Sequence, residues 1–270
     1  MRACLALLLH SVRRVRSLVL AMAALLAAFQ ILLAFAARSL QELNTFPQLA
    51  ALIPDFLRQI LGPSLLTLMS FRGIACLGYF HVAIMATLIG LMIALATEPV
   101  SEAETRFLDL ILSHPLARHW VISRTIALLA ACIVLLLGAM MSGTRLGLYW
   151  LAPEDMAQAT FRVIPALTLN LGLLLLCWGS IALALASIAH RRSVAAAATA
   201  LLAMACYMTD LIAQIWKPLK PVVRYSPFHY YNSLNLIMGS SDMTGDTLTL
   251  ASIAVTGFLL AYLFFQRRDL

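Results

Sequence analysis

The sequence predicts an all-α integral membrane protein in which residues 1–270 form a single domain with six transmembrane helices. First, 62% of the residues are hydrophobic and 11% are charged, whereas an average soluble domain is about 45–50% apolar and about 25% charged. Second, the apolar residues gather in stretches that as helices would be about 29–39 Å long, enough to cross a hydrocarbon core of about 30 Å. The stretches are 17–37, 74–96, 121–142, 164–189, 193–216 and 247–265.

The same composition argues against several other classes of protein. A soluble enzyme or a nucleic-acid-binding protein is not expected, because so apolar a chain lacks a water-facing surface. The net charge of +7 arises from basic residues that stand mostly at the ends of the apolar stretches, where they serve topology. The five cysteines are widely separated, with no C-x-x-C pair, so neither a disulfide framework nor a metal site is predicted.

The first apolar stretch, 17–37, follows Arg13, Arg14 and Arg16 and could be taken for a cleavable signal peptide. It is longer than the 7–15 residues of a signal h-region, so we expect a retained span. Before it, residues 2–16 carry leucine and valine at helical spacing. This pattern predicts a short helix lying along the cytoplasmic membrane surface, with a solvated basic tail as the alternative.

The distribution of lysine and arginine predicts the orientation of the chain. If the N-terminus is cytoplasmic, the cytoplasmic segments hold ten basic residues in about 48 positions, against eight in about 87 on the other side. Both termini are therefore predicted to lie in the cytoplasm.

The segment between the second and third stretches, residues 98–118, carries most of the functional information. It opens with three carboxylates and continues as a short helix with an apolar face that includes Phe107 and Leu112. Pro115 should end this helix near Ser113. An exposed helix of this kind can insert its apolar face into a groove on a soluble partner; a helix that merely lies on the membrane is the alternative.

This segment is similar to the signature of ATP-binding-cassette (ABC) permeases of the second type, the six-span membrane subunits of many bacterial exporters. It reads E-x-E-x-x-F-x-D-x-x-L-S-x-P-x-x-R, where the family has E-x-E-x-G-[T/F]-x-[E/D]-x-x-L-[S/A]-x-P-x-x-R; Arg106 stands where Gly is common. Residues 225–231 resemble the family's SPF-x-Y segment, and residues 265–270 resemble its F-x-x-R-D-L ending. The matching loop residues are Glu102, Glu104, Phe107, Asp109, Leu112, Ser113, Pro115 and Arg118.

The resemblance implies a function, partners and a location. Two permease subunits, identical or related, would enclose a pathway for ATP-driven export, and each would dock on an ATPase subunit through the loop residues named above, which form a coupling helix. A short re-entrant segment would precede the sixth span. The sequence has no G-x-x-x-x-G-K-[S/T] phosphate loop, so a separate ATPase would bind ATP and Mg²⁺, and this chain would hold no cofactor, metal or catalytic residue. It would be a multi-pass protein of the cytoplasmic (inner) membrane.

Polar side chains within the apolar stretches are a second group of candidates, because such groups are costly at membrane depth. Asp210 either faces the pathway or forms an ion pair with Lys217 or Arg224 near the surface, and we favour the ion pair. His81 and Asn170 are expected to form hydrogen bonds between helices rather than to bind substrate. The candidates for the pathway are His81, Asn170, Asp210 and Gln214, with Gln30 also at membrane depth and Arg124 near a cytoplasmic end.

Two other functional classes remain as alternatives. A secondary transporter would need charged or broken helices near the membrane midplane, whereas the stretches here are continuous and nearly uncharged. An intramembrane enzyme is less favoured still, because the segment Trp178-Gly-Ser-Ile lacks the G-x-S-x motif and no H-E-x-x-H motif occurs. The cargo is left open, with hydrophobic or amphipathic molecules preferred.

Overall fold

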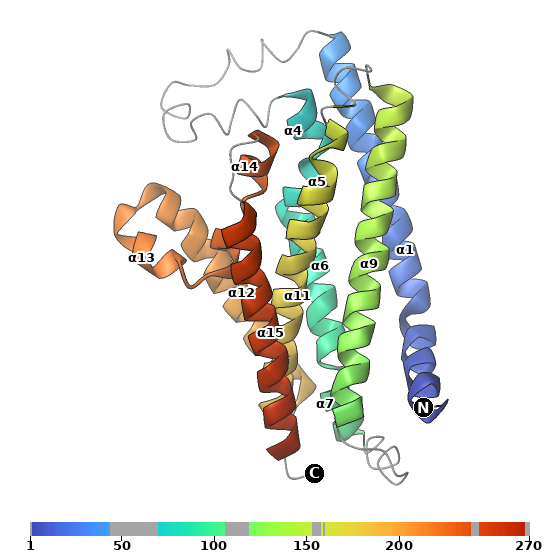
Figure 1. Cartoon of the computed structure of the whole chain (residues 1–270), viewed down its shortest axis with the longest axis vertical. Helices are drawn as coiled ribbons and strands as arrows, with labels where there is room; N and C mark the ends of the chain where they lie inside the picture. The colour runs from blue at the N-terminus through green and yellow to red at the C-terminus, as the bar shows by residue number, and fades with distance from the viewer. Residues whose placement is uncertain are drawn as a thin grey trace.

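The structure, a computed structural model, describes residues 2–43, 70–105, 119–152, 158, 160–238 and 243–267. These residues form helices and no strand, as predicted. Figure 1 shows an elongated bundle with both termini at one end, here called the termini end, and the opposite end is the far end. The long helices are α1 (Arg2–Glu42), α9 (His119–Leu151), α11 (Ile164–Ile188), α12 (Arg192–Ile215) and α15 (Met243–Arg267).

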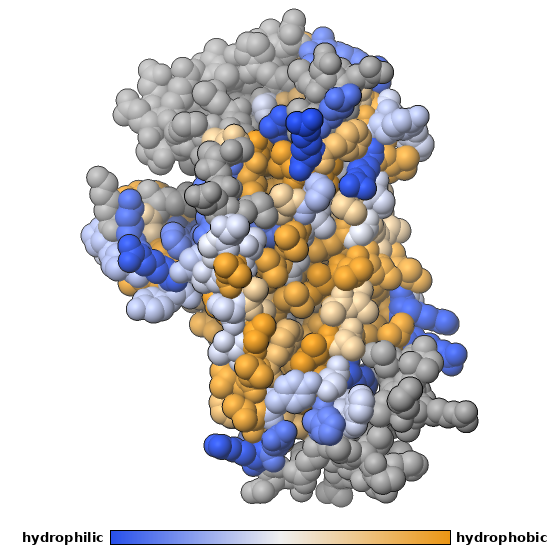
Figure 2. All heavy atoms as spheres, in the orientation of Figure 1, coloured by the Kyte–Doolittle hydropathy of each residue, from blue (hydrophilic) through white to orange (hydrophobic). Residues whose placement is uncertain are grey.

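Each long helix contains an apolar segment that can cross a membrane, and a bent pair of helices described below raises the number of candidate spans from five to as many as six. Five of the six predicted stretches lie within the long helices, except that α11 and α12 each end one residue before the predicted stretch does. In Figure 2 hydrophobic residues cover the middle of the visible face, and hydrophilic residues gather toward its ends. This distribution is typical of a body that crosses a bilayer.

The N-terminal helix corrects one prediction. Residues 2–16 are not a separate surface helix but the first part of α1, which runs for 41 residues without a break. The physical reason is that residues 2–42 contain neither proline nor glycine, so nothing interrupts the backbone hydrogen bonds. At 1.5 Å per residue, α1 is about 62 Å long, roughly twice the thickness of the hydrocarbon core.

The second predicted span, 74–96, is not the single continuous helix that we expected. It is divided among α4 (Phe71–Ala75), α5 (Leu77–Phe80) and α6 (Val82–Ala96). Residue 81 has extended backbone angles, φ −68° and ψ 124°, and separates α5 from α6. After α6 the chain bends by 41° into α7 (Glu98–Glu104).

Four short helices join α12 to α15. They are η1 (Lys217–Leu219), α13 (Lys220–Val223), η2 (Pro227–Tyr230) and α14 (Ser233–Met238), and we call residues 217–238 the insert. Figure 1 shows α13 projecting to one side of the bundle and α14 close to the start of α15. Short helices occur where the sequence predicted a re-entrant segment, and their depth in the membrane stays a prediction.

Glycine residues allow two pairs of long helices to pack closely. A Cβ atom on Gly143 of α9 would lie 2.6 Å from the backbone oxygen of Ala27 on α1, and one on Gly147 would also meet α1. A Cβ atom on Gly257 of α15 would overlap the side chain of Ser180 on α11. Small residues at such crossings let the backbones of membrane helices approach each other.

We expect Gly143→Ala to destabilise the protein by about 1–3 kcal/mol, because the new methyl group would push α9 away from the backbone of α1. The matched control is Gly138→Ala on the same helix, where an added Cβ has no neighbour within 4 Å. The measurement is the apparent melting temperature of the purified chain in detergent. Equal melting temperatures for the two variants would show that this crossing does not limit stability.

Candidate functional site

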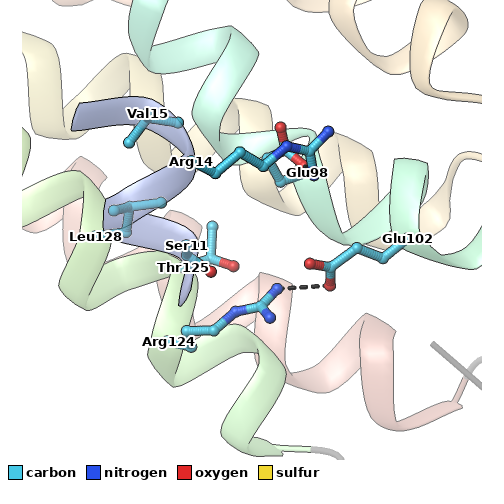
Figure 3. A pocket seen from close by; sticks show the side chains of 8 residues that line it. All are labelled: Ser11, Arg14, Val15, Glu98, Glu102, Arg124, Thr125 and Leu128. Carbon is cyan, nitrogen blue, oxygen red and sulfur yellow. Dashed lines mark hydrogen bonds and ion pairs between the residues drawn. The ribbon is translucent and has the colours of Figure 1, made fainter. Parts of the chain in front are cut away.

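The best-defined polar site lies at the termini end, around α7. This helix follows α6 directly and has Pro99 in its first turn, where the missing N–H of proline costs no hydrogen bond. Its carboxylates are those of Glu98, Glu102 and Glu104, all within seven residues. Figure 3 shows Glu98 and Glu102 beside arginines from the neighbouring helices, around a small hollow.

Glu102 joins α7 to α9 through a buried ion pair. Its carboxylate accepts a hydrogen bond from the guanidinium of Arg124, and the two side chains are 9% and 8% exposed. Figure 3 marks this contact with a dashed line. An arginine buried in this way depends on its carboxylate, because the charge has little access to water.

Glu98 lies between two arginines from different helices. Its Oε2 atom is 3.1 Å from a guanidinium nitrogen of Arg14 on α1, and its Oε1 atom is 3.6 Å from one of Arg192 on α12. Arg192 also donates hydrogen bonds to the backbone oxygen of Ala94 (3.1 Å) and to the hydroxyl of Thr97 (3.4 Å). The Arg14 and Arg192 side chains are 56% and 35% exposed, so water weakens both ion pairs.

Glu104 makes the third connection. Its Oε1 atom accepts a hydrogen bond of 2.8 Å from the backbone N–H of Arg192, the first residue of α12. A carboxylate at this position pairs an N–H group that has no partner within the helix, and it interacts favourably with the helix dipole. Side chains of α7 therefore contact α1, α9 and α12. We call Glu98, Glu102, Glu104, Arg14, Arg124 and Arg192 the α7 hub.

Comparison with known protein families identifies the family to which this chain belongs. A family described as ABC-2 family transporter protein matches residues 9–270. The chain belongs to the ABC-2 transporter family. A search of curated proteins finds no significant match. The protein is thus a multi-pass membrane permease of an ABC transporter, and membership of this family implies partnership with an ATP-binding subunit.

The remainder of the predicted docking loop follows α7 directly in the sequence. Of the eight predicted docking residues, Glu102 and Glu104 are described, and both make the intramolecular contacts given above. The other six, Phe107, Asp109, Leu112, Ser113, Pro115 and Arg118, lie outside the described residues. The docking role of the loop therefore stays a prediction, but both of its ends adjoin the hub, because it leaves from α7 and enters α9 five residues before Arg124.

The polar residues predicted within the spans do not form one site. His81 is exposed at the break of the second span, with its ring edge-on to Phe29 at 6.5 Å between ring centres. Asn170 on α11 is buried, and its side-chain oxygen has no hydrogen-bond partner. The expected hydrogen bond between helices is thus missing for this oxygen. No described contact joins His81 to Asn170.

Asp210 and Gln214 both belong to α12. Asp210 is partly buried, and no ion pair with Arg224 is present among the described residues. The imidazole of His229 on η2 and the side chain of Tyr207 are close enough to interact with its charge. The side chains of Gln214 and Lys217 lie outside the described part of the chain. Whether Asp210 and Gln214 face the pathway stays a prediction.

The sequence indicated Arg124 as a polar residue at membrane depth, but the pairing of Arg14, Arg124 and Arg192 with the glutamates of α7 was not predicted. Arg14 and Arg192 stand at the ends of apolar stretches, where basic residues also serve topology, and Arg124 lies inside a predicted span. A signal was nevertheless present. Three carboxylates within seven residues at the membrane boundary require cations nearby, because like charges in a poorly solvated place repel.

Proposed function

We propose that the permease, together with a second identical or related permease subunit, encloses a pathway for ATP-driven export across the cytoplasmic membrane, with both termini in the cytoplasm. We further propose that residues 98–118 dock on a separate ATP-binding-cassette ATPase. ATP and Mg²⁺ would be bound by that ATPase, and this chain would bind no cofactor and perform no catalysis. The observation that carries the proposal is the position of α7, which begins the docking loop and contacts three long helices through charged side chains.

The hub suggests how a movement of the loop reaches the membrane. The ion pair between Glu102 and Arg124 is buried, so separating it would leave a charge without water or partner. We therefore expect α7 and α9 to move together. The contacts of Glu98 with Arg14 and Arg192 are accessible to water, so they can break and form again at little cost.

This difference divides the hub into a permanent link and two exchangeable links. When ATP binding draws the two ATPases together, the loop would move α7 with α9, and the contacts to α1 and α12 would change. ATP would then shift the population between inward-open and outward-open states by binding one of them more tightly. Glu102 has little surface to offer the ATPase, so its part is to hold α7 in place.

The test is affinity purification of the tagged permease from its native membranes, followed by mass spectrometry. We expect an ATP-binding-cassette ATPase in about the same amount as the permease, and we expect its loss with Phe107→Asp or Asp109→Arg. The control is Tyr149→Asp, at an exposed position two residues before the end of α9, which should retain the ATPase. Purification of the permease alone, without vanadate-sensitive ATP hydrolysis, would contradict the proposal and favour a secondary transporter.

A further inference from the structure

The break between α5 and α6 occurs without a proline, although Gly78 lies three residues before residue 81. No backbone hydrogen bond spans residue 81, yet residues 74–96 contain no proline. One way in which a helix breaks without proline is the entry of another group into its backbone hydrogen-bond ladder. Here that group comes from the insert, because the hydroxyl of Tyr231 donates to the backbone oxygen of Tyr79. Burial raises the pKa of Tyr231, so its hydroxyl keeps the proton that it donates.

The two sides of the break are attached to different parts of the molecule. On the far side, the backbone oxygen of Tyr79 is bound to Tyr231 of the insert, and the Tyr79 hydroxyl shares a buried hydrogen bond of 3.2 Å with Thr144 of α9. Arg72 of α4 donates a hydrogen bond of 3.1 Å to the backbone oxygen of Ile237 in α14. On the near side, α6 continues into α7 and the hub. Residue 81 thus separates α4 and α5, which are bonded to the insert and to the far part of α9, from α6, which continues into α7.

A buried amide beside the break lacks any partner. Gln30 of α1 is 0% exposed, and neither its Nε2 nor its Oε1 atom makes a hydrogen bond. The amide lies against the backbone of Gly78 on α5, so closely that a Cβ atom there would overlap it. An unpaired amide in an apolar interior is costly, and such a group needs an explanation. Backbone oxygens that the break releases from helical hydrogen bonds lie in the same region, at residues 78–80.

We propose that residue 81 is a hinge of the second span, at which α6 moves with α7 while α4 and α5 stay with the insert. In the conformation described here, Tyr231 holds the backbone oxygen of Tyr79, and Gln30 has no partner. In the second conformation, the Tyr231 contact opens, and the Gln30 amide donates to a backbone oxygen of residues 78–80. That the docking loop causes the motion rests on the proposed function, whereas the hinge itself requires only residues of this chain.

The test is hydrogen–deuterium exchange of the full-length permease in lipid nanodiscs, followed in the peptide that spans residues 78–84. Gln30→Met keeps the shape of the side chain and removes the amide, so it removes the partner available in the second conformation. Exchange should slow about tenfold, which is ~1.4 kcal/mol in the opening equilibrium. Tyr231→Phe removes only the hydroxyl that holds the described conformation, and exchange should become about tenfold faster.

The matched control is Gln41→Met, the same change at the far end of α1, which should leave this peptide unaffected. Exchange equal to wild type in both Gln30→Met and Tyr231→Phe would overturn the hinge. If Gln30→Met fails to fold, Tyr231→Phe decides alone, since it removes a single oxygen atom. The experiment needs no ATPase. Its failure would therefore leave docking untouched, and loss of the ATPase from purified complexes would leave the hinge untouched.

Discussion

Glu102→Gln is expected to lower the stability of the permease by about 3–5 kcal/mol, because it leaves the guanidinium of Arg124 buried without its carboxylate. Both side chains are less than a tenth exposed, so water cannot replace the lost partner. The measurement is the apparent melting temperature in detergent, or the midpoint of unfolding by a denaturing detergent. The double variant Glu102→Gln/Arg124→Met should recover much of the loss, since it removes the isolated charge.

The control for this prediction is Glu42→Gln. It breaks the ion pair with Arg38 on α1, whose side chains are 46% (Arg38) and 62% (Glu42) exposed, and such pairs contribute less than about 1 kcal/mol. Equal and small effects for Glu102→Gln and Glu42→Gln would mean that the pair with Arg124 is not the permanent link that we propose between α7 and α9.

Arg192→Ala is expected to leave the ATPase bound to the permease but to lower ATP hydrolysis by the complex about tenfold. The side chain of Arg192 connects α12 with Ala94 and Thr97, which precede the docking loop, and with Glu98, the first residue of that loop. Losing these contacts would cost about 1–2 kcal/mol in the step that transmits motion to α12. The measurement is vanadate-sensitive hydrolysis of reconstituted complexes, normalised to the amount of bound ATPase.

Arg191→Ala is the natural comparison, because it removes an equal charge from the adjacent position, where the side chain is exposed. It should preserve hydrolysis. If the two variants behave alike, the number of charges near the membrane matters and the hub geometry does not. If Arg192→Ala releases the ATPase, Arg192 takes part in docking rather than in transmission.

Much of the fold could be predicted because a helix that crosses a bilayer needs an apolar stretch whose length is set by the thickness of the hydrocarbon core. Six apolar stretches had the length of a span, and five of them lie, to within one residue, inside single helices, of which α1 and α9 extend well beyond the predicted bounds. The prediction for residues 2–16 failed for a specific reason. Periodicity shows which face of a helix is apolar, but only the absence of proline and glycine from residues 2–42 shows that the helix continues.

The break at residue 81 could not have been predicted from its surroundings. Tyr231, whose hydroxyl binds the backbone oxygen of Tyr79, stands 152 residues later in the chain. A pattern in the local sequence cannot indicate so distant a contact. The same limit applied at the hub. Glu102 and Glu104 attracted attention through their spacing, but the arginines that bind them come from α9 and α12. Only the packing of the helices brings these residues together.

The charges of the α7 hub have a further consequence. Three glutamates face three arginines, so the hub is formally neutral. Carrying one elementary charge across a membrane costs about 2.3 kcal/mol per 100 mV of membrane potential. In the proposed movement, however, α7 travels with Arg124 of α9 while the contacts to Arg14 and Arg192 change. The part of the hub that moves then carries three carboxylates and one guanidinium, a formal charge of −2. The membrane potential would act on this charge, whereas a hub that moved as a whole would do no electrical work.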